Sequence, residues 1–88
     1  MENIYRKPLP GWTQEGQSLI RTDVFADFAA AMRWVNQVAI LAERRNHHPD
    51  IDIRWNRVTL KLTTHETGGL TDRDWDWAEA AVLELGQD

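Results

Sequence analysis

Residues 43–74 read ERRNHHPDIDIRWNRVTLKLTTHETGGLTDRD, and the middle of this stretch decides the fold. Apolar residues there occupy every second position on both sides of a short polar turn: Ile51, Ile53 and Trp55, then Val58, Leu60 and Leu62. Such alternation is typical of strands that bury one face. We therefore predict a hairpin with strands over residues 50–55 and 58–64, joined by a two-residue turn at Asn56 and Arg57.

The same stretch contains all three histidines of the chain, His47, His48 and His65. Pro49 disfavours a helical conformation at His48, so the chain leaves a helix and turns at the histidine pair. The two predicted strands have similar lengths, and the hairpin therefore returns His65 towards that pair. Because histidine is the only side chain whose unperturbed pKa, about 6.5, lies near neutrality, we treat this cluster as a candidate site.

Before the histidine pair, the apolar period changes to that of a helix. We predict a helix from Asp27 to about Arg45, with Asp27 as its N-cap or as an acid in its first turn, and with basic residues at its C-terminal end. Its expected apolar stripe comprises Phe28, Ala31, Met32, Val35, Val38, Ala39 and Ala42. Trp34, Ile40 and Leu41 fall outside this stripe, and we interpret them as flank packing or as a subunit contact.

The N-terminal part of the chain predicts a second hairpin. Residues 1–10 contain two prolines and are expected to form an extended arm. Two strands are expected over residues 11–14 and 18–25, separated by a glycine-containing turn. The alternation of the second strand is imperfect, because Arg21 and Asp23 fall on its apolar face.

The residues after the central hairpin predict a bend and a final helix. Gly68 and Gly69 supply the bend. Thr71 begins the helix, Asp74 forms a short variant of the capping box, and Gly86 ends it. The element order is therefore β-β-α-β-β-α. Paired strands with separate helices predict an α+β fold, in which helices pack on one face of a four-stranded antiparallel sheet.

The composition bounds the class of protein. A length of 88 residues suits a single domain over residues 1–88. The absence of cysteine excludes disulfides, thiolate metal sites and a cysteine nucleophile. Five tryptophans, a residue type enriched in cores and interfaces, lead us to expect association with another chain. The formal net charge of −4 disfavours nonspecific binding to nucleic acid or to an anionic membrane.

The sequence also bears on location. The N-terminal segment MENIYRKPLPGW lacks the apolar region of a signal peptide. No stretch approaches the roughly 20 apolar residues of a membrane span. We therefore expect a cytoplasmic protein.

Three imidazoles and a nearby carboxylate suffice for general acid–base chemistry near neutral pH. Glu43 lies one helical turn before His47 and could orient an imidazole. Two alternatives are that the histidines are ordinary loop residues, or that they bind zinc. Neighbouring histidines rarely converge on one ion, so the spacing argues against a metal. Ser18, the only serine, lies in a predicted strand, which argues against a nucleophilic triad.

The spacing as a whole resembles the signature of the pterin-4a-carbinolamine dehydratases. The core positions are Glu43, His47-His48-Pro49, Trp55, His65 and Asp74. Further similar segments are Gly11-Trp12, residues 25–28, Val38-Ala39, Trp55-Asn56, residues 62–65 (LTTH), residues 69–71 and Arg73-Asp74. The resemblance runs from Gly11 to the end of the chain, and this many spaced positions make it specific.

The resemblance implies a hydro-lyase that converts 4a-hydroxytetrahydropterin to quinonoid dihydropterin in tetrahydrobiopterin recycling, with no metal or organic cofactor. The positions matching His47 and His65 would be general acids for a hydroxyl on either face of the ring. The position matching His48 would hold the substrate. The remaining pocket residues implied by the family are Glu43, Pro49, Thr64, Glu66, Thr67 and Asp74, with Trp12 and Trp55 as ring neighbours.

The family also implies a homodimer or homotetramer that acts on a small-molecule pterin, without direct binding to nucleic acid or membrane. The sequence departs from the family pattern in its short N-terminal arm, in Asn46, where an acid is common, and in Asp23, where an aromatic residue often packs. The alternative is a non-catalytic regulatory or protein-binding module with the same fold. The apolar flank of the first helix at Trp34, Ile40 and Leu41, and the tryptophan-rich last helix, would provide the contact.

Overall fold

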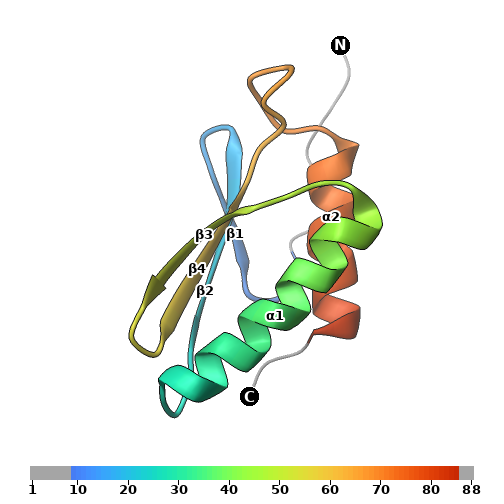
Figure 1. The fold of residues 1–88 in the computed structure, drawn as a ribbon. Helices are drawn as coiled ribbons and strands as arrows, with labels where there is room; N and C mark the ends of the chain where they lie inside the picture. Colours follow the sequence, from blue (N-terminus) through green and yellow to red (C-terminus); the bar gives the residue numbers. More distant parts are fainter. Residues whose placement is uncertain (1–8, 86–88) are drawn as a thin grey trace.

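The computed structural model describes residues 9–85, and its element order is the predicted one (Figure 1). The elements are β1 (Trp12–Glu15), β2 (Ser18–Val24), α1 (Phe28–Arg45), β3 (Asp50–Arg54), β4 (Arg57–Leu62) and α2 (Asp72–Glu84). The antiparallel sheet has the order β1-β2-β4-β3, and both helices lie on one of its faces. This confirms the predicted α+β class. Most of the predicted arm over residues 1–10, and the predicted helix end at Gly86, lie outside the described residues.

The core lies between the sheet and the two helices. On β4, alternate residues Val58, Leu60 and Leu62 are completely buried, whereas Lys61 on the opposite face is exposed. Leu19 of β2 pairs with Leu62 and is also buried, so the central strands present one continuous apolar face. Neither of the two described helices is long and apolar enough to cross a membrane.

The two charged residues on the apolar face of β2 form a buried ion pair. Arg21 Nε lies 2.7 Å from Asp23 Oδ2, and each residue is only 5% exposed. The Arg21 guanidinium also lies 5.1 Å from the ring centroid of Trp34, a distance suited to a cation–π contact. A buried charge is tolerated when it is paired and hydrogen-bonded. The two charged residues that interrupt the alternation of this strand, Arg21 and Asp23, are therefore the two partners of one ion pair.

The capping residues predicted from the sequence set the starts of both helices. Asp27 Oδ1 accepts a hydrogen bond of 2.8 Å from the backbone N–H of Ala30 at the start of α1. At the start of α2, the Thr71 hydroxyl accepts from Arg73 N at 3.3 Å, and Asp74 Oδ2 accepts from Thr71 N at 3.0 Å. These reciprocal bonds satisfy helix N–H groups that have no partner within the helix.

The buried face of α1 is rotated relative to the predicted stripe. Trp34 and Leu41 are 4% and 1% exposed, whereas Phe28 and Ile40 are 50% and 57% exposed. Because Trp34 has the largest apolar side chain on the helix, turning it inward buries the most surface. The interpretation of Trp34 and Leu41 as a flank or subunit contact is therefore wrong, and only Ile40 of the three remains available for one.

The turn between β3 and β4 is Trp55-Asn56, so the prediction of a turn at Asn56 and Arg57 is wrong by one residue. Arg54 pairs with Arg57, and Trp55 adopts a left-handed φ of 53°. Asn56 explains the shift, since its side-chain amide donates to the Phe25 carbonyl and its own carbonyl accepts from Phe25 N, both at 2.8 Å. These two bonds hold Asn56 in the turn, next to the start of α1.

We expect Asn56→Ala to lower the free energy of unfolding by about 1–2 kcal/mol, because it leaves the part-buried Phe25 carbonyl without its side-chain donor. Urea denaturation followed by circular dichroism measures this loss. The control Asn36→Ala changes the same residue type at an exposed position of α1 and is expected to cost much less. Equal losses in the two variants would show that the side-chain bond of Asn56 does not stabilise the hairpin.

Most of the tryptophans are accounted for by the core of this chain. Trp12, Trp34, Trp75 and Trp77 are each at most 8% exposed. Trp55 alone is exposed, at 68%, on the tip of the hairpin. The expectation of a homodimer or homotetramer therefore remains a prediction. Of the tryptophans that suggested association with another chain, only Trp55 is exposed enough to contact one.

Candidate active site

The end of α1 determines how the histidine pair is presented. Asn46 adopts a left-handed conformation (φ 53°, ψ 43°), and His47 N donates to the Ala42 carbonyl at 3.2 Å. Asparagine tolerates this conformation better than most residues do, and such a residue commonly ends a helix. The turn at Asn46 directs His47 inward, where it is 8% exposed, and leaves His48 exposed. Asn46 therefore allows the backbone to turn at the end of α1. The acid that is common at this position in the family did not suggest such a role.

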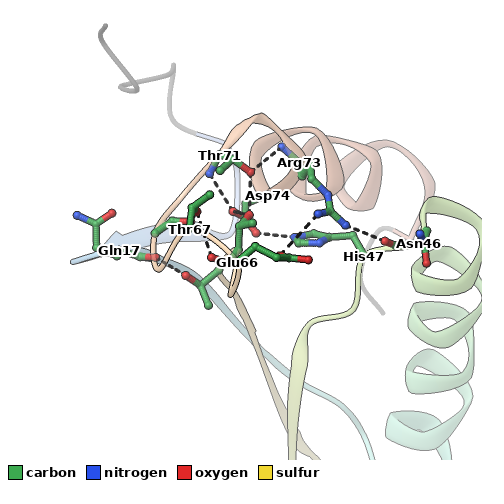
Figure 2. A network of polar contacts seen from close by, with 11 residues as sticks. Gln17, Asn46, His47, Glu66, Thr67, Thr71, Arg73 and Asp74 are labelled. Atoms are coloured by element: carbon green, nitrogen blue, oxygen red, sulfur yellow. Dashed lines mark hydrogen bonds and ion pairs between the residues drawn. The ribbon is translucent and has the colours of Figure 1, made fainter. Parts of the chain in front are cut away.

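His47 is held by a buried carboxylate on α2. Its Nε2 atom lies 2.6 Å from Oδ1 of Asp74, a residue with no exposed surface. The other oxygen of Asp74 accepts from the Thr64 hydroxyl at 2.7 Å and from Thr71 N at 3.0 Å (Figure 2). A carboxylate only accepts hydrogen bonds, so Nε2 of His47 is the donor and Nδ1 is the ring nitrogen left for a ligand.

His48 interacts with the preceding helix. Its Nε2 atom lies 2.7 Å from Oε2 of Glu43, in agreement with the expectation that Glu43 orients an imidazole. The side chains of His48 and Glu43 are 55% and 78% exposed. A polar contact this exposed contributes little stability, even when both partners are charged. The contact restricts the position of the ring while leaving it open to solvent.

His65 lies in a tight loop that follows β4. The loop is closed by Thr64 N donating to the Gly69 carbonyl at 3.1 Å, and by Gly68 N donating to the Thr64 carbonyl at 2.9 Å. Gly68 has a φ of 71°, a conformation that favours glycine. The Thr67 hydroxyl donates to the Thr64 carbonyl at 3.2 Å and so stabilises the loop itself. His65 is the first residue after Thr64 in this loop, and it is exposed.

A hollow of about 310 Å³ brings the three histidines together. It is lined by Asn46, His47, His48, Thr63, His65, Glu66 and Arg73. The hairpin does return His65 to the pair, as the matched lengths of its strands indicated. Thr64 and Asp74 do not line the hollow; Asp74 contacts His47, and Thr64 in turn donates to Asp74.

Arg73, which sequence reasoning did not single out as a site residue, connects the two histidine-bearing segments. Its guanidinium donates to the Asn46 carbonyl at 3.0 Å and lies 3.9 Å from Oε1 of Glu66 (Figure 2). Asn46 precedes the histidine pair, and Glu66 follows His65. One signal in the sequence could have indicated Arg73 as a site residue: it stands next to Asp74 in the first turn of α2, and that turn lies against both histidine-bearing loops.

The structure does not bring the two predicted ring neighbours to this hollow. Trp12 lies in the core on β1, where its ring packs edge-on against Trp77 with centroids 6.3 Å apart. Trp55 lies at the tip of the β3–β4 hairpin, and the histidines lie at the other end (Figure 1). Pro49 directly follows the histidine pair but is not among the lining residues. The assignment of these residues to substrate binding remains a prediction.

The site provides proton donors and acceptors. Within residues 9–85, it combines one buried imidazole, fixed by Asp74, with two exposed imidazoles on the wall of the same hollow. Histidines placed in this way suit general acid–base chemistry. The fold and site together define an α+β domain with a hollow lined by three histidines.

Comparison with known proteins identifies the family. Residues 2–82 match the family model described as pterin 4 alpha carbinolamine dehydratase, and the chain belongs to this family. A relative from Thermomicrobium roseum, provisionally named as a pterin-4-alpha-carbinolamine dehydratase, is 61% identical over 66 residues. That alignment covers 75% of this chain and 71% of the relative.

Solved structures agree with the fold. A protein from Brucella melitensis described as a transcriptional coactivator/pterin dehydratase superimposes with a TM-score of 0.80 at 32% identity, over 89% of this chain and 85% of that one. A pterin dehydratase-like protein described as a RuBisCO assembly factor in the alpha-carboxysome has a TM-score of 0.67 at 18% identity, over 88% and 89%. The second likeness concerns the fold alone.

Proposed function

We propose that this protein dehydrates 4a-hydroxytetrahydropterin to quinonoid dihydropterin by histidine acid–base catalysis, as part of tetrahydropterin recycling. The observation that carries the proposal is the hollow in which His47, held by buried Asp74, faces the same space as His48 and His65. Membership of the dehydratase family supplies the reaction class.

The reaction is an elimination in which atoms balance without another reactant. The bond between C4a and its hydroxyl oxygen breaks, and an acid protonates that oxygen so that it leaves as water. The N5–H group loses its proton, and its electron pair forms the C4a=N5 double bond. Oxidation state does not change overall, so the step requires no oxidant or reductant.

The three histidines have different environments, and these suggest different roles. His47 can act as an acid at Nδ1 when its ring is doubly protonated, because Asp74 accepts from Nε2 and leaves Nδ1 without this partner. His65 has no hydrogen bond from its side chain to another residue among 9–85, so its ring can turn towards a hydroxyl on the other face of the pterin. His48, restrained by Glu43, is suited to holding the ring and assisting proton removal.

A coupled assay tests the proposal. An aromatic amino-acid hydroxylase with a reduced pterin generates the carbinolamine, and the formation of quinonoid dihydropterin is followed by absorbance. We expect catalytic amounts of the purified protein to accelerate dehydration by about 10²-fold or more over the spontaneous rate, which is the range for positioned acid–base groups.

The alternative of a non-catalytic module predicts a different result in the same assay. Such a module would keep the fold but leave the spontaneous rate unchanged. Most of the residues that suggested its contact surface belong to the core of this chain: Trp34 and Leu41 on α1, and Trp75 and Trp77 on α2. A rate equal to the spontaneous one, with protein shown to be folded by circular dichroism, would reject the proposed activity.

A further inference from the structure

A second hollow, of about 380 Å³, adjoins the histidine hollow. It is lined by Arg44, Arg45, His47, Arg73 and Asp76. His47 and Arg73 line both hollows, so these two side chains form the boundary between them. A ligand in the histidine hollow could therefore extend past this boundary into the second one.

The second hollow is positively charged, although the chain as a whole is acidic, with 10 lysines and arginines against 14 acids. Three arginines and one aspartate line it. Arg44 is paired with Glu84 of α2. The side chain of Arg45, in contrast, has no hydrogen bond or ion pair to another residue in the described range 9–85, and it is exposed and lines the hollow.

Arg73 has donors to spare at this boundary. A guanidinium carries five N–H donors, and among residues 9–85 that of Arg73 has one bond, to the Asn46 carbonyl, and a long contact of 3.9 Å to Glu66. Its position fixes the guanidinium between the histidine-bearing loops (Figure 2). Arg45 and Arg73 together can therefore present several N–H groups to one anion.

A simpler reading of the arginines is that they complement helix dipoles. Arg44 and Arg45 lie in the last turn of α1, where basic residues are favoured. Arg73 lies in the first turn of α2, where the positive end of the helix favours acids instead. The dipole therefore does not explain why arginines from two different helices converge on one hollow.

We propose that the arginine hollow binds the anionic end of the substrate's side chain, so that the preferred substrate is a pterin whose tail carries a phosphate or a carboxylate. This inference rests on the function proposed above. The bicyclic ring occupies the histidine hollow, and the substituent on its C6 atom passes between His47 and Arg73. The anion at the end of the tail then accepts hydrogen bonds from Arg45 and Arg73.

Calorimetric titration with unreactive, oxidised pterins tests this proposal without relying on turnover. Three ligands are compared: one with a neutral hydroxyalkyl tail, the same molecule as its phosphate monoester, and one whose tail of equal length ends in a carboxylate. We expect at least one anionic ligand to bind wild-type protein about tenfold more tightly than the neutral one, as a charge-assisted contact provides. The two anionic arms identify which anion is preferred.

Arg45→Gln is the informative variant, because Arg45 is exposed and its replacement does not disturb the core. This variant is expected to lose the tenfold preference and to bind the neutral pterin as before. Arg33→Gln removes the same charge from an exposed position elsewhere on α1 and is expected to keep the preference. Raising the salt concentration should reduce the preference in the wild type.

The outcomes separate this inference from the proposed function. If the neutral pterin binds and the anionic ligands bind no better, the tail site is wrong while the pterin site stands. If the preference survives in Arg45→Gln, the anion binds elsewhere and the assignment of the hollow fails. If no pterin binds to folded protein, both the tail site and the proposed function are overturned.

Discussion

Replacing both His47 and His65 with alanine is expected to reduce dehydration to the spontaneous rate, a loss of about 10²-fold or more. Each residue can protonate the leaving hydroxyl from its own side of the hollow, so either one alone sustains part of the reaction. The double variant has no acid on either face. The coupled hydroxylase assay described above measures the three rates side by side.

The single variants sharpen this prediction when the two epimers of the carbinolamine are resolved. His47→Ala should slow one epimer, and His65→Ala should slow the other. Lys61→Ala, on the exposed face of β4, is the control for a neutral substitution and is expected to retain the wild-type rate. Equal slowing of both epimers by each single variant would contradict the assignment of one acid to each face.

Because His47 is buried against Asp74, its replacement by alanine leaves a buried carboxylate with one partner fewer. The variant His47→Gln guards against a loss of activity caused by unfolding. Its amide can still donate to Asp74 but cannot transfer a proton at neutral pH. Loss of rate in a folded His47→Gln, His65→Gln protein therefore reports on proton transfer rather than on stability.

Asp74→Asn is expected to lower kcat by about 10²-fold for the epimer that His47 protonates, with little change for the epimer that His65 protonates, while leaving the protein folded. The amide oxygen of asparagine can still accept from Thr64 and from the backbone of Thr71, as Asp74 Oδ2 does. Its NH2 group then faces His47 Nε2, where two donors would meet if the ring were doubly protonated. The acid form of His47 is thus disfavoured, and we expect a stability loss of only about 1–2 kcal/mol.

Asp72→Asn supplies the matched control, since it removes the same charge from an exposed position in the same turn of α2. It should leave kcat nearly unchanged. Steady-state kinetics on both variants, with urea denaturation of the same samples, separates catalysis from folding. An Asp74→Asn protein with wild-type kcat would show that Asp74 serves only to cap α2.

Local patterns in the sequence were sufficient for the architecture. Asp27 and Thr71 identified both helix starts, and the alternation over residues 58–62 identified the central buried strand. The errors arose where distant contacts decide the outcome. Asn56 is drawn into the hairpin turn by its bonds to Phe25, 31 residues away, and no periodicity in the hairpin reveals that contact.

The same distinction between local patterns and distant contacts applies to the site. Spacing placed all three histidines together, because a hairpin with matched strands returns the chain to its origin. Spacing could not show that Asp74 holds His47, since that bond joins residues 27 positions apart on separate elements. Nor could it show the contact of Arg73 with Asn46, which depends on how α2 packs beside the end of α1.

The most direct test of the central claim, that the hollow of three histidines is the pterin site, is proton NMR of the histidine rings during titration with an unreactive dihydropterin. The chain has only three histidines, so each ring signal can be assigned from one His→Gln variant. We predict that the signals of His47, His48 and His65 all shift with one common dissociation constant, while the indole signal of the buried Trp77 does not. Saturating pterin that leaves all three histidine signals unmoved would contradict the account.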